Sequence, residues 1–280
     1  MRLTALMPVR DYHPVFLGKA VDSMFAQTSP DWRLVVIAEP DRRDEIARVL
    51  ASALGDSRTE LIANRGRKLA GALNTGMKHA GTDFVGILFG DDMWSPDAVA
   101  VLTDEILAHP EVDFFHSSRR VIGADDEPVT GVQRSRDEVR LEDFGPSSPV
   151  KHLLCWRRAK ALAVGGMDET LNSVGPDDFD FPWTMAEHGA EFRAVPDCLY
   201  LYRHHHACFR LTTHLPRSVH VAELRRIMRK HGMGRLAIAR HLLKARHTYL
   251  RQCLYRSPLE RWVREWARLA PRQTWSPYRG

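Results

Sequence analysis

Apolar runs and polar breaks alternate regularly over the first 117 residues of the chain. Short apolar stretches with the length of buried strands lie at 3–9, 32–38, 60–63, 84–89 and 112–117. The segments between them predict helices at 14–27, 43–54, 69–80 and 96–108. The run at 84–89 has no polar alternation, which is typical of a strand covered on both faces. This alternation of strands and helices predicts a doubly wound, mostly parallel α/β sheet.

The pattern loosens after residue 118. Residues 119–148 are rich in Asp, Glu, Gly, Pro and Ser, and they predict a hairpin followed by a loop. Further along, we expect two short strands at 192–195 and 198–203, with a helix at 179–188 before them. The sequence shows no internal repeat.

Charge divides the chain near residue 215. The 280 residues carry a net charge of +5, but residues 216–280 hold 16 Lys/Arg against 3 Asp/Glu, which leaves 24 against 32 before them. We therefore predict a catalytic α/β domain at 1–215 and a basic, helical extension at 216–280.

Composition excludes several classes of protein. No apolar run approaches the roughly 18 residues that cross a bilayer, and no charged-then-apolar leader opens the sequence. The four cysteines show no C-x-x-C pairing, which argues against a zinc knot or a disulfide framework. These features favour the reducing cytoplasm.

Two adjacent carboxylates follow the apolar run at 84–89. Asp91 and Asp92 come after Gly90, at the carboxyl end of a predicted central strand, where open α/β sheets bind ligands. Two neighbouring carboxylates repel each other and can bind a hard divalent cation, which would in turn bind a diphosphate. We expect Ser95 to be the N-cap of the following helix and Pro96 its first residue. The alternative for the two carboxylates is a solvated turn with a helix cap.

Seven short motifs occur in an order that resembles the family-2, inverting glycosyltransferases of GT-A fold. No one motif is specific, but together they cover residues 3–206. They read Pro8-Val9-Arg10-Asp11, Glu39, Asn64-Arg65-Gly66 with Ala72-Leu73-Asn74-Thr75-Gly76, Phe89-Gly90-Asp91-Asp92, Gly165-Gly166-Met167-Asp168-Glu169, Asp177-Asp178-Phe179-Asp180 and Tyr202-Arg203-His204-His205.

The resemblance implies transfer of a sugar from a nucleotide diphosphate donor, with UDP as the family default, to a hydroxyl acceptor, assisted by Mn²⁺ or Mg²⁺. Two positions depart from the family pattern: Phe89 replaces the first Asp of D-x-D, and Asp177 replaces a Glu. We interpret Phe89 as a change in nucleotide contact. The Q-x-x-R-W signature of processive polymer synthases is missing after Asp178, which favours transfer of a single sugar.

The resemblance also assigns residues to the donor. The backbone of Pro8, Val9 and Arg10 and the side chains of Asp11 and Glu39 would surround the base. Arg67 and Asn74 would reach the ribose or phosphate, although Asn74 has the alternative of bonding a neighbouring loop.

The metal and the diphosphate would meet a further set of side chains. Asp91, Asp92 and His205 are the expected metal ligands, and Asp91 and Arg203 also face the nucleotide-sugar. In an extended segment, His205 points away from its neighbours His204 and His206.

Two acidic residues and two tryptophans are candidates for the acceptor side. Asp178 is the expected general base, with Asp177 as the second choice, since a partly desolvated carboxylate can take a proton from a hydroxyl. The alternative is that either residue caps the next helix. Trp156 and Trp183 would line an acceptor pocket, because sugars stack on aromatic faces, or else belong to the core.

The basic extension leaves three contacts open: anionic lipid at the inner face of the membrane, the acidic catalytic domain, or a second copy of the chain. No nucleic-acid module accompanies it, so we expect no nucleic-acid partner. Two other functions are alternatives to sugar transfer. A non-catalytic nucleotide-sugar-binding or scaffold protein would suit Phe89, and a nucleotidyltransferase would need a Gly- and Lys-rich loop after the first strand, which Pro8–Tyr12 does not supply.

Overall fold

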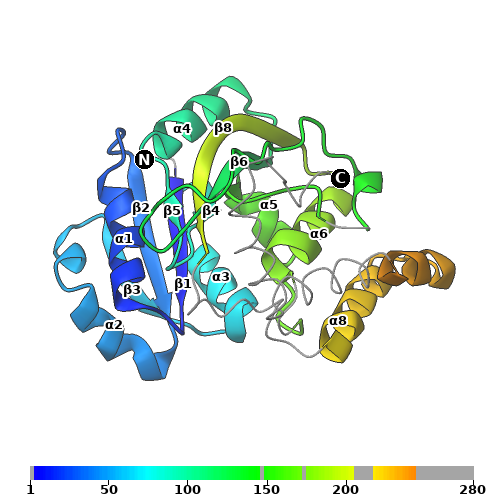
Figure 1. Ribbon diagram of the computed structural model, residues 1–280, viewed down its shortest axis with the longest axis horizontal. Coiled ribbons are helices and arrows are strands. Elements are labelled where there is room, and N and C mark those ends of the chain that lie inside the picture. Colours follow the sequence, from blue (N-terminus) through cyan, green and yellow to red (C-terminus); the bar gives the residue numbers. More distant parts are fainter. Residues whose placement is uncertain (1–2, 146–147, 172–174, 205–216, 244–280) are drawn as a thin grey trace, which may run out of the picture. The chain divides into compact units, whose positions relative to one another are not determined.

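The computed structural model describes residues 3–145, 148–171, 175–204 and 217–243 (Figure 1). The chain divides into two compact units, Met1–Glu223 and Leu224–Gly280. The strands of the first unit are β1 (Leu3–Val9), β2 (Trp32–Ala38), β3 (Thr59–Ala63), β4 (Phe84–Ile87), β5 (Met93–Trp94), β6 (Phe114–Ile122), β7 (Leu154–Arg157) and β8 (Phe192–Arg203). Its helices are α1 (Pro14–Phe25), α2 (Arg43–Val49), α3 (Lys68–His79), α4 (Ala98–Ala108), α5 (Arg158–Ala163) and α6 (Phe181–Glu187).

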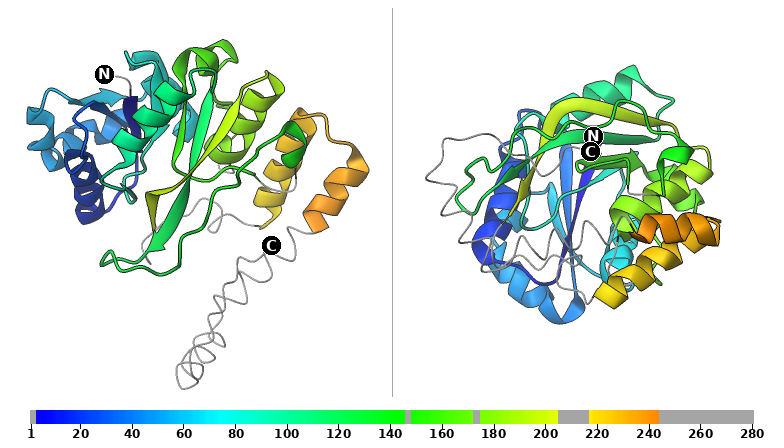
Figure 2. Two further views of the ribbon diagram at one scale, coloured as in Figure 1. Left: turned by 90° about the horizontal axis from the view of Figure 1, so that it is seen from above. Right: turned by 45° about the vertical axis from the view of Figure 1, so that its right-hand side comes forward.

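All eight strands form one sheet in the order β3-β2-β1-β4-β7-β6-β8-β5. β1 pairs in parallel with β2 and with β4, and β2 pairs in parallel with β3. β7 is antiparallel to both β4 and β6, while β6 and β8 run side by side in parallel (Figure 2). The sheet is therefore mostly parallel, as predicted.

Helices cover both faces of this sheet (Figure 1). Alternate residues of β1 point to opposite faces, so that Leu3, Ala5 and Met7 join a core with α1, α2 and α4, while Leu6 joins a core with α3, α5 and α6. A sheet buried on both faces explains why its strands read as continuous apolar runs.

Two local predictions were wrong. Ser95 is not the N-cap of α4, which begins at Ala98; Met93 and Trp94 instead form the edge strand β5 against β8. The side chain of Gln27 takes the capping role, since its Oε1 accepts a hydrogen bond from the Val99 N–H at 2.9 Å and its Nε2 donates to the Ser95 carbonyl at 2.7 Å.

The two short strands expected at 192–203 are one strand. β8 pairs with β6 along its whole length, with a register shift where Ser117 lies opposite Val195 and Ser118 opposite Cys198. Pro196 falls in this irregularity, and since proline has no N–H to donate, a bulge is where a paired strand accommodates it.

Residues 224–243 are the described part of the second unit. They comprise the end of α8 (Arg217–Lys230), a turn, and a helical segment over 235–243. Across the described parts of the chain, no helix combines the length and the apolar character needed to span a membrane.

Candidate functional site

Most of the predicted site residues lie along one edge of the sheet. β1 to β4 run in one direction, and β6 and β8 share that direction because β4 and β6 are both antiparallel to β7. The carboxyl ends of these strands therefore meet at the same edge, and so do the residues just before β7. This is the edge at which open α/β sheets bind ligands.

The residues predicted to surround the base follow β1. Val9 is buried and Pro8 is half-buried, whereas Arg10 and Asp11 are exposed. A carboxylate oxygen of Asp11 lies 3.9 Å from the Arg42 guanidinium. Exposed side chains next to a buried strand end are accessible to a ligand, and their contact with a nucleotide stays a prediction.

Glu39 and Arg67 lie beyond the ends of β2 and β3. The Glu39 carboxylate accepts a hydrogen bond from the side-chain Nδ2 of Asn64 at 2.9 Å. The side-chain Oδ1 of Asn64 in turn accepts one from the Gly66 N–H at 2.8 Å. The side chain of Arg67 is exposed. The turn at 64–66 thus orients the Glu39 carboxylate, while the Arg67 guanidinium remains accessible.

Asn74 has a structural role. Its side chain is buried and makes three hydrogen bonds: it donates to the Met167 carbonyl and to the Glu169 carboxylate, and it accepts from the Met167 N–H, all within 2.9 Å. Glu169 also accepts a hydrogen bond from the Arg67 N–H at 2.8 Å. Of the two alternatives for Asn74, the structure therefore supports the bond to a neighbouring loop, because each of its amide atoms is already engaged by protein.

Asp92 is buried beneath the turn that follows β4. Its two carboxylate oxygens accept hydrogen bonds at 2.7 Å, one from the Tyr200 hydroxyl and one from the Arg203 N–H. Burial and the neighbouring charge of Asp91 raise the pKa of Asp92 well above its usual range. Asp91 is only half-buried. Asp92 thus fastens the turn to the end of β8, and Asp91 is the more accessible of the two carboxylates.

Arg203 is fully buried at the end of β8 and holds three segments together. Its Nε donates to the Asp91 carbonyl at 2.8 Å, and its Nη1 donates to the Gly123 carbonyl at 2.9 Å and pairs with the Asp126 carboxylate. The guanidinium also lies 4.8 Å from the centre of the Phe16 ring. With these partners, Arg203 holds the turn that carries Asp91 in place. This role differs from the direct contact with the diphosphate that the motif suggested.

His152 connects the Asp91 turn to the second acidic motif. Its ring is buried, lies 5.4 Å from the rings of both Phe89 and Tyr200, and places Nε2 3.4 Å from a carboxylate oxygen of Asp177. Its Nδ1 has no hydrogen-bond partner among the described residues. The apolar ring of Phe89 therefore helps to shield the pair of His152 and Asp177 from water, which strengthens their interaction.

Asp177 and Asp178 lie in the short π-helical turn Pro176–Asp180 that leads into α6. Burial, followed by the charge of Asp177, raises the pKa of Asp178 to about 6, while His152 and Arg119 oppose the rise. Asp177 pairs with His152. Asp178 is therefore the carboxylate of the two whose pKa suits proton exchange near neutral pH. The helix expected at 179–188 begins at Phe181, and no side-chain cap bond is formed at its start.

Three members of this site were not found from the sequence: His152, Tyr200 and Arg119. His152 stands just before β7, and its only sequence signal is its place before the apolar run Leu153-Leu154-Cys155-Trp156. Arg119 lies on β6, its guanidinium 5.1 Å from the centre of the Tyr202 ring, and its charge lowers the pKa of both Asp92 and Asp178. These contacts join strands that are distant in sequence, which a linear pattern does not reveal.

The prediction that Trp156 lines an acceptor pocket was wrong. Trp156 is fully buried in the core, where its ring stacks on Phe114 and its indole N–H points to the Met77 sulfur at 3.3 Å. Trp183 is 5% exposed and stacks on Phe144 with ring centres 5.9 Å apart. A sugar cannot stack on a ring face that protein already covers, and both tryptophans belong to the packed interior.

No cluster of three or more His, Cys, Asp or Glu side chains suited to a metal ion occurs within residues 3–145, 148–171, 175–204 and 217–243. His205, one of the expected ligands, lies outside these ranges. A Mg²⁺ or Mn²⁺ ion bound to a nucleotide commonly takes one or two protein carboxylates and completes its shell with phosphate oxygens and water. The accessible Asp91 fits that manner of binding, and metal use stays a prediction.

Solved structures share the fold of this chain. S. aureus TarS 1–349 in complex with UDP-GlcNAc superposes with a TM-score of 0.64 at 15% sequence identity, covering 89% of this chain and 72% of that one. At this level of identity, the similarity establishes a GT-A fold.

Curated sequences are also related to this chain. The O-antigen biosynthesis protein RfbC of Myxococcus xanthus is 27% identical over 203 residues, which cover 71% of this chain and 15% of RfbC. The Escherichia coli UDP-Glc:alpha-D-GlcNAc-diphosphoundecaprenol beta-1,3-glucosyltransferase WfgD is 27% identical over 107 residues, 38% of this chain and 41% of WfgD. The chain therefore spans less than half the length of each of these relatives. The family model of glycosyl transferase family 2 matches residues 4–156, more than half of the chain. The chain belongs to glycosyl transferase family 2.

Proposed function

We propose that this protein transfers a single sugar, with inversion, from a UDP-sugar to a hydroxyl group of an acceptor, with the help of a divalent cation. The observation that carries the proposal is Asp178, a partly exposed carboxylate whose pKa is raised to about 6. It stands at the ligand-binding edge of the sheet, in contact through Asp177 and His152 with the turn that carries Asp91. A base and a nucleotide-binding turn at one edge are the two parts that the reaction requires.

Asp178 acts as the general base in this proposal. The acceptor hydroxyl attacks the anomeric carbon, its proton passes to the Asp178 carboxylate, and the bond from the anomeric carbon to the nucleotide diphosphate breaks on the opposite face. A base is most effective when its pKa lies near the working pH, which a value of about 6 satisfies. His152 holds the carboxylate of Asp177 and so keeps the two acidic side chains distinct in role.

Asp91 is the residue that would hold the cation, with Asp92 and Arg203 fixing the turn that carries it. A bound Mn²⁺ or Mg²⁺ would neutralise charge on the departing diphosphate. Asp92 contributes by position, since Tyr200 and the Arg203 N–H occupy its oxygens. His205 remains a candidate for the same cation from the segment outside the described residues.

The choice of UDP is supported by proteins that resemble this one. TarS has been solved in complex with UDP and with UDP-GlcNAc, and the name of WfgD specifies UDP-Glc as its donor. The name of WfgD also specifies a lipid-linked diphosphate acceptor, and RfbC is an O-antigen biosynthesis protein. We therefore infer a role in glycan biosynthesis at the inner face of the cytoplasmic membrane, with a saccharide or lipid-linked hydroxyl as acceptor.

Thermal unfolding in the presence of nucleotides tests the proposal. UDP, GDP and dTDP are each added with Mn²⁺ or with EDTA, because a ligand that binds only the folded state raises its stability by mass action. We expect UDP with Mn²⁺ to raise the melting temperature and EDTA to remove the rise. The variant Asp91→Ala should lose the metal-dependent part, whereas Asp44→Ala, an exposed carboxylate on α2, should keep it. If no nucleotide raises the melting temperature, a non-catalytic scaffold role is favoured.

A further inference from the structure

The described part of the second unit is basic throughout. Within 224–243 the sequence has no Asp or Glu and six Lys or Arg residues, namely Arg225, Arg226, Arg229, Lys230, Arg235 and Arg240. So dense a positive charge in a segment that contains no Asp or Glu repels itself, and an anionic ligand would relieve that repulsion.

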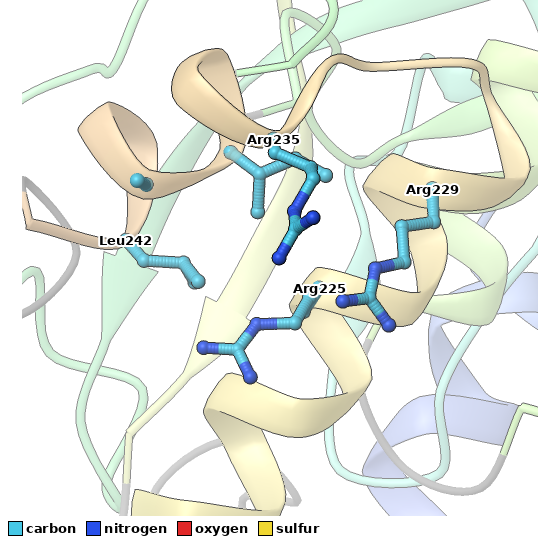
Figure 3. A pocket seen from close by; sticks show the side chains of 6 residues that line it. Arg225, Arg229, Arg235 and Leu242 are labelled. Carbon is cyan, nitrogen blue, oxygen red and sulfur yellow. The ribbon is translucent and has the colours of Figure 1, made fainter.

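Three of these arginines line one cavity. Arg225 and Arg229 lie one turn apart on α8, Arg235 begins the next helical segment, and the side chains of all three line the cavity (Figure 3). The cavity has a volume of about 240 Å³. None of the three side chains has a carboxylate within ion-pair distance in the described ranges. Guanidinium groups bind phosphate through paired N–H donors, so a cavity lined by three of them suits a phosphate group.

Apolar side chains complete the cavity and continue beyond it. Ile238, Ala239 and Leu242 line its other wall. On the same helical segment, Leu236 is 85% exposed and Leu243 is 63% exposed, about two helical turns apart and thus on one face. Large apolar side chains exposed beside a cationic site are typical of helices that lie in a membrane surface, where arginine binds phosphate and leucine enters the acyl region.

We propose that residues 225–243 form a binding site for anionic phospholipid. A lipid phosphate binds Arg225, Arg229 and Arg235, while Leu236 and Leu243 insert among the acyl chains of the same leaflet. A soluble phosphate would engage the arginines alone and would leave the two leucines in water. Sites for single-stranded nucleic acid usually contain aromatic side chains on which the bases stack. Residues 224–243 contain no Phe, Tyr or Trp, which argues against such a ligand. The proposal stands independently of the donor and of the transfer reaction.

Vesicle sedimentation with the full chain tests the site. We expect binding to vesicles of phosphatidylcholine with phosphatidylglycerol, and little binding to phosphatidylcholine alone. The double variant Arg229→Gln with Arg235→Gln should weaken binding about 30-fold, because each arginine at an anionic surface contributes about fivefold. The double variant Leu236→Ser with Leu243→Ser should weaken it by tenfold or more, since each leucine loses its apolar burial.

Arg240→Gln is the matched control, because Arg240 lies on the same helical segment but does not line the cavity. Because Arg240 does not contact the bound phosphate, its replacement should weaken binding by less than the roughly fivefold expected for each cavity arginine. UDP-induced thermal stabilisation, measured on every variant, reports whether the catalytic unit is folded and separates failure of this site from failure of the proposed reaction.

Three results would overturn the proposal. The first is equal binding to neutral and anionic vesicles. The second is saturable binding of inorganic phosphate or glycerol phosphate that the arginine variant abolishes, without any vesicle binding, which would make this a site for soluble phosphate. The third is binding of single-stranded RNA without binding of vesicles.

Discussion

Replacing Asp178 with asparagine should stabilise the protein while it abolishes sugar transfer. Burial and the charge of Asp177 raise the pKa of Asp178 from 3.8 to about 6, so the folded state binds this proton more tightly than the unfolded state does. Stability is therefore lost as the pH rises from about 4 to above 6. Asparagine has nearly the same shape and carries no charge, so the variant avoids this loss.

The size of the effect follows from the pKa. One pKa unit corresponds to about 1.36 kcal/mol, so ionised Asp178 lowers the free energy of unfolding by up to about 3 kcal/mol at pH 7.5. Asp178 is only partly buried, and screening by water reduces this figure. We expect Asp178→Asn to gain about 1–2 kcal/mol at pH 7.5 and well under 1 kcal/mol at pH 4, where the folded wild type is already protonated.

Urea unfolding at pH 4, 5.5 and 7.5, followed by tryptophan fluorescence, measures this gain. Sugar transfer and UDP-induced thermal shift are measured on the same preparations, and transfer should be lost while UDP binding survives. Asp177→Asn is the control: it removes a charge that raises the pKa of Asp178 but also the carboxylate that pairs with His152, so its gain should be smaller than that of Asp178→Asn. An Asp178→Asn variant that is less stable than wild type at pH 7.5, or equally stabilised at all three pH values, would refute the reasoning.

Two further predictions concern residues around this carboxylate. His152→Gln removes a group that lowers the pKa of Asp178, so the acid limb of the pH–rate profile should move to higher pH by about half to one unit, and an unchanged limb would show that His152 does not act on the base. Arg203→Met leaves the Asp91 and Gly123 carbonyls without their donor and should cost about 3–5 kcal/mol in urea unfolding. Arg120→Met on β6 is its control, and an equal loss in both would contradict a special role for Arg203.

The fold could be predicted from the sequence because its signals are local. β2 has the predicted bounds, 32–38, since a strand covered on both faces is nearly continuously apolar and Arg33 is its only charged residue. The start of α4 could not be predicted, because the side chain that caps it belongs to Gln27, which lies just after the end of α1. A sequence pattern indicates only capping residues that lie next to the helix start.

The site was predicted less completely, since its chemistry depends on contacts across the sheet. The acidic motifs identified Asp91, Asp177 and Asp178 as candidates, but a motif does not distinguish a carboxylate that holds a strand from one that meets a ligand. Asp92 accepts its hydrogen bonds from residues more than 100 positions away in the chain. His152, which pairs with Asp177, lies in no motif at all.

The bonds between Glu169 and the start of α3 have a consequence for the stability of the segment that the family model matches. The Arg67 N–H and the buried Asn74 amide find their partners in Glu169 and Met167, between 93 and 102 residues later. A chain that ends at residue 156 therefore has β1 to β4 but lacks the segment whose hydrogen bonds hold the start of α3 and the Asn74 amide. We therefore expect residues 4–156 to be less stable alone than within a chain that continues through Glu169.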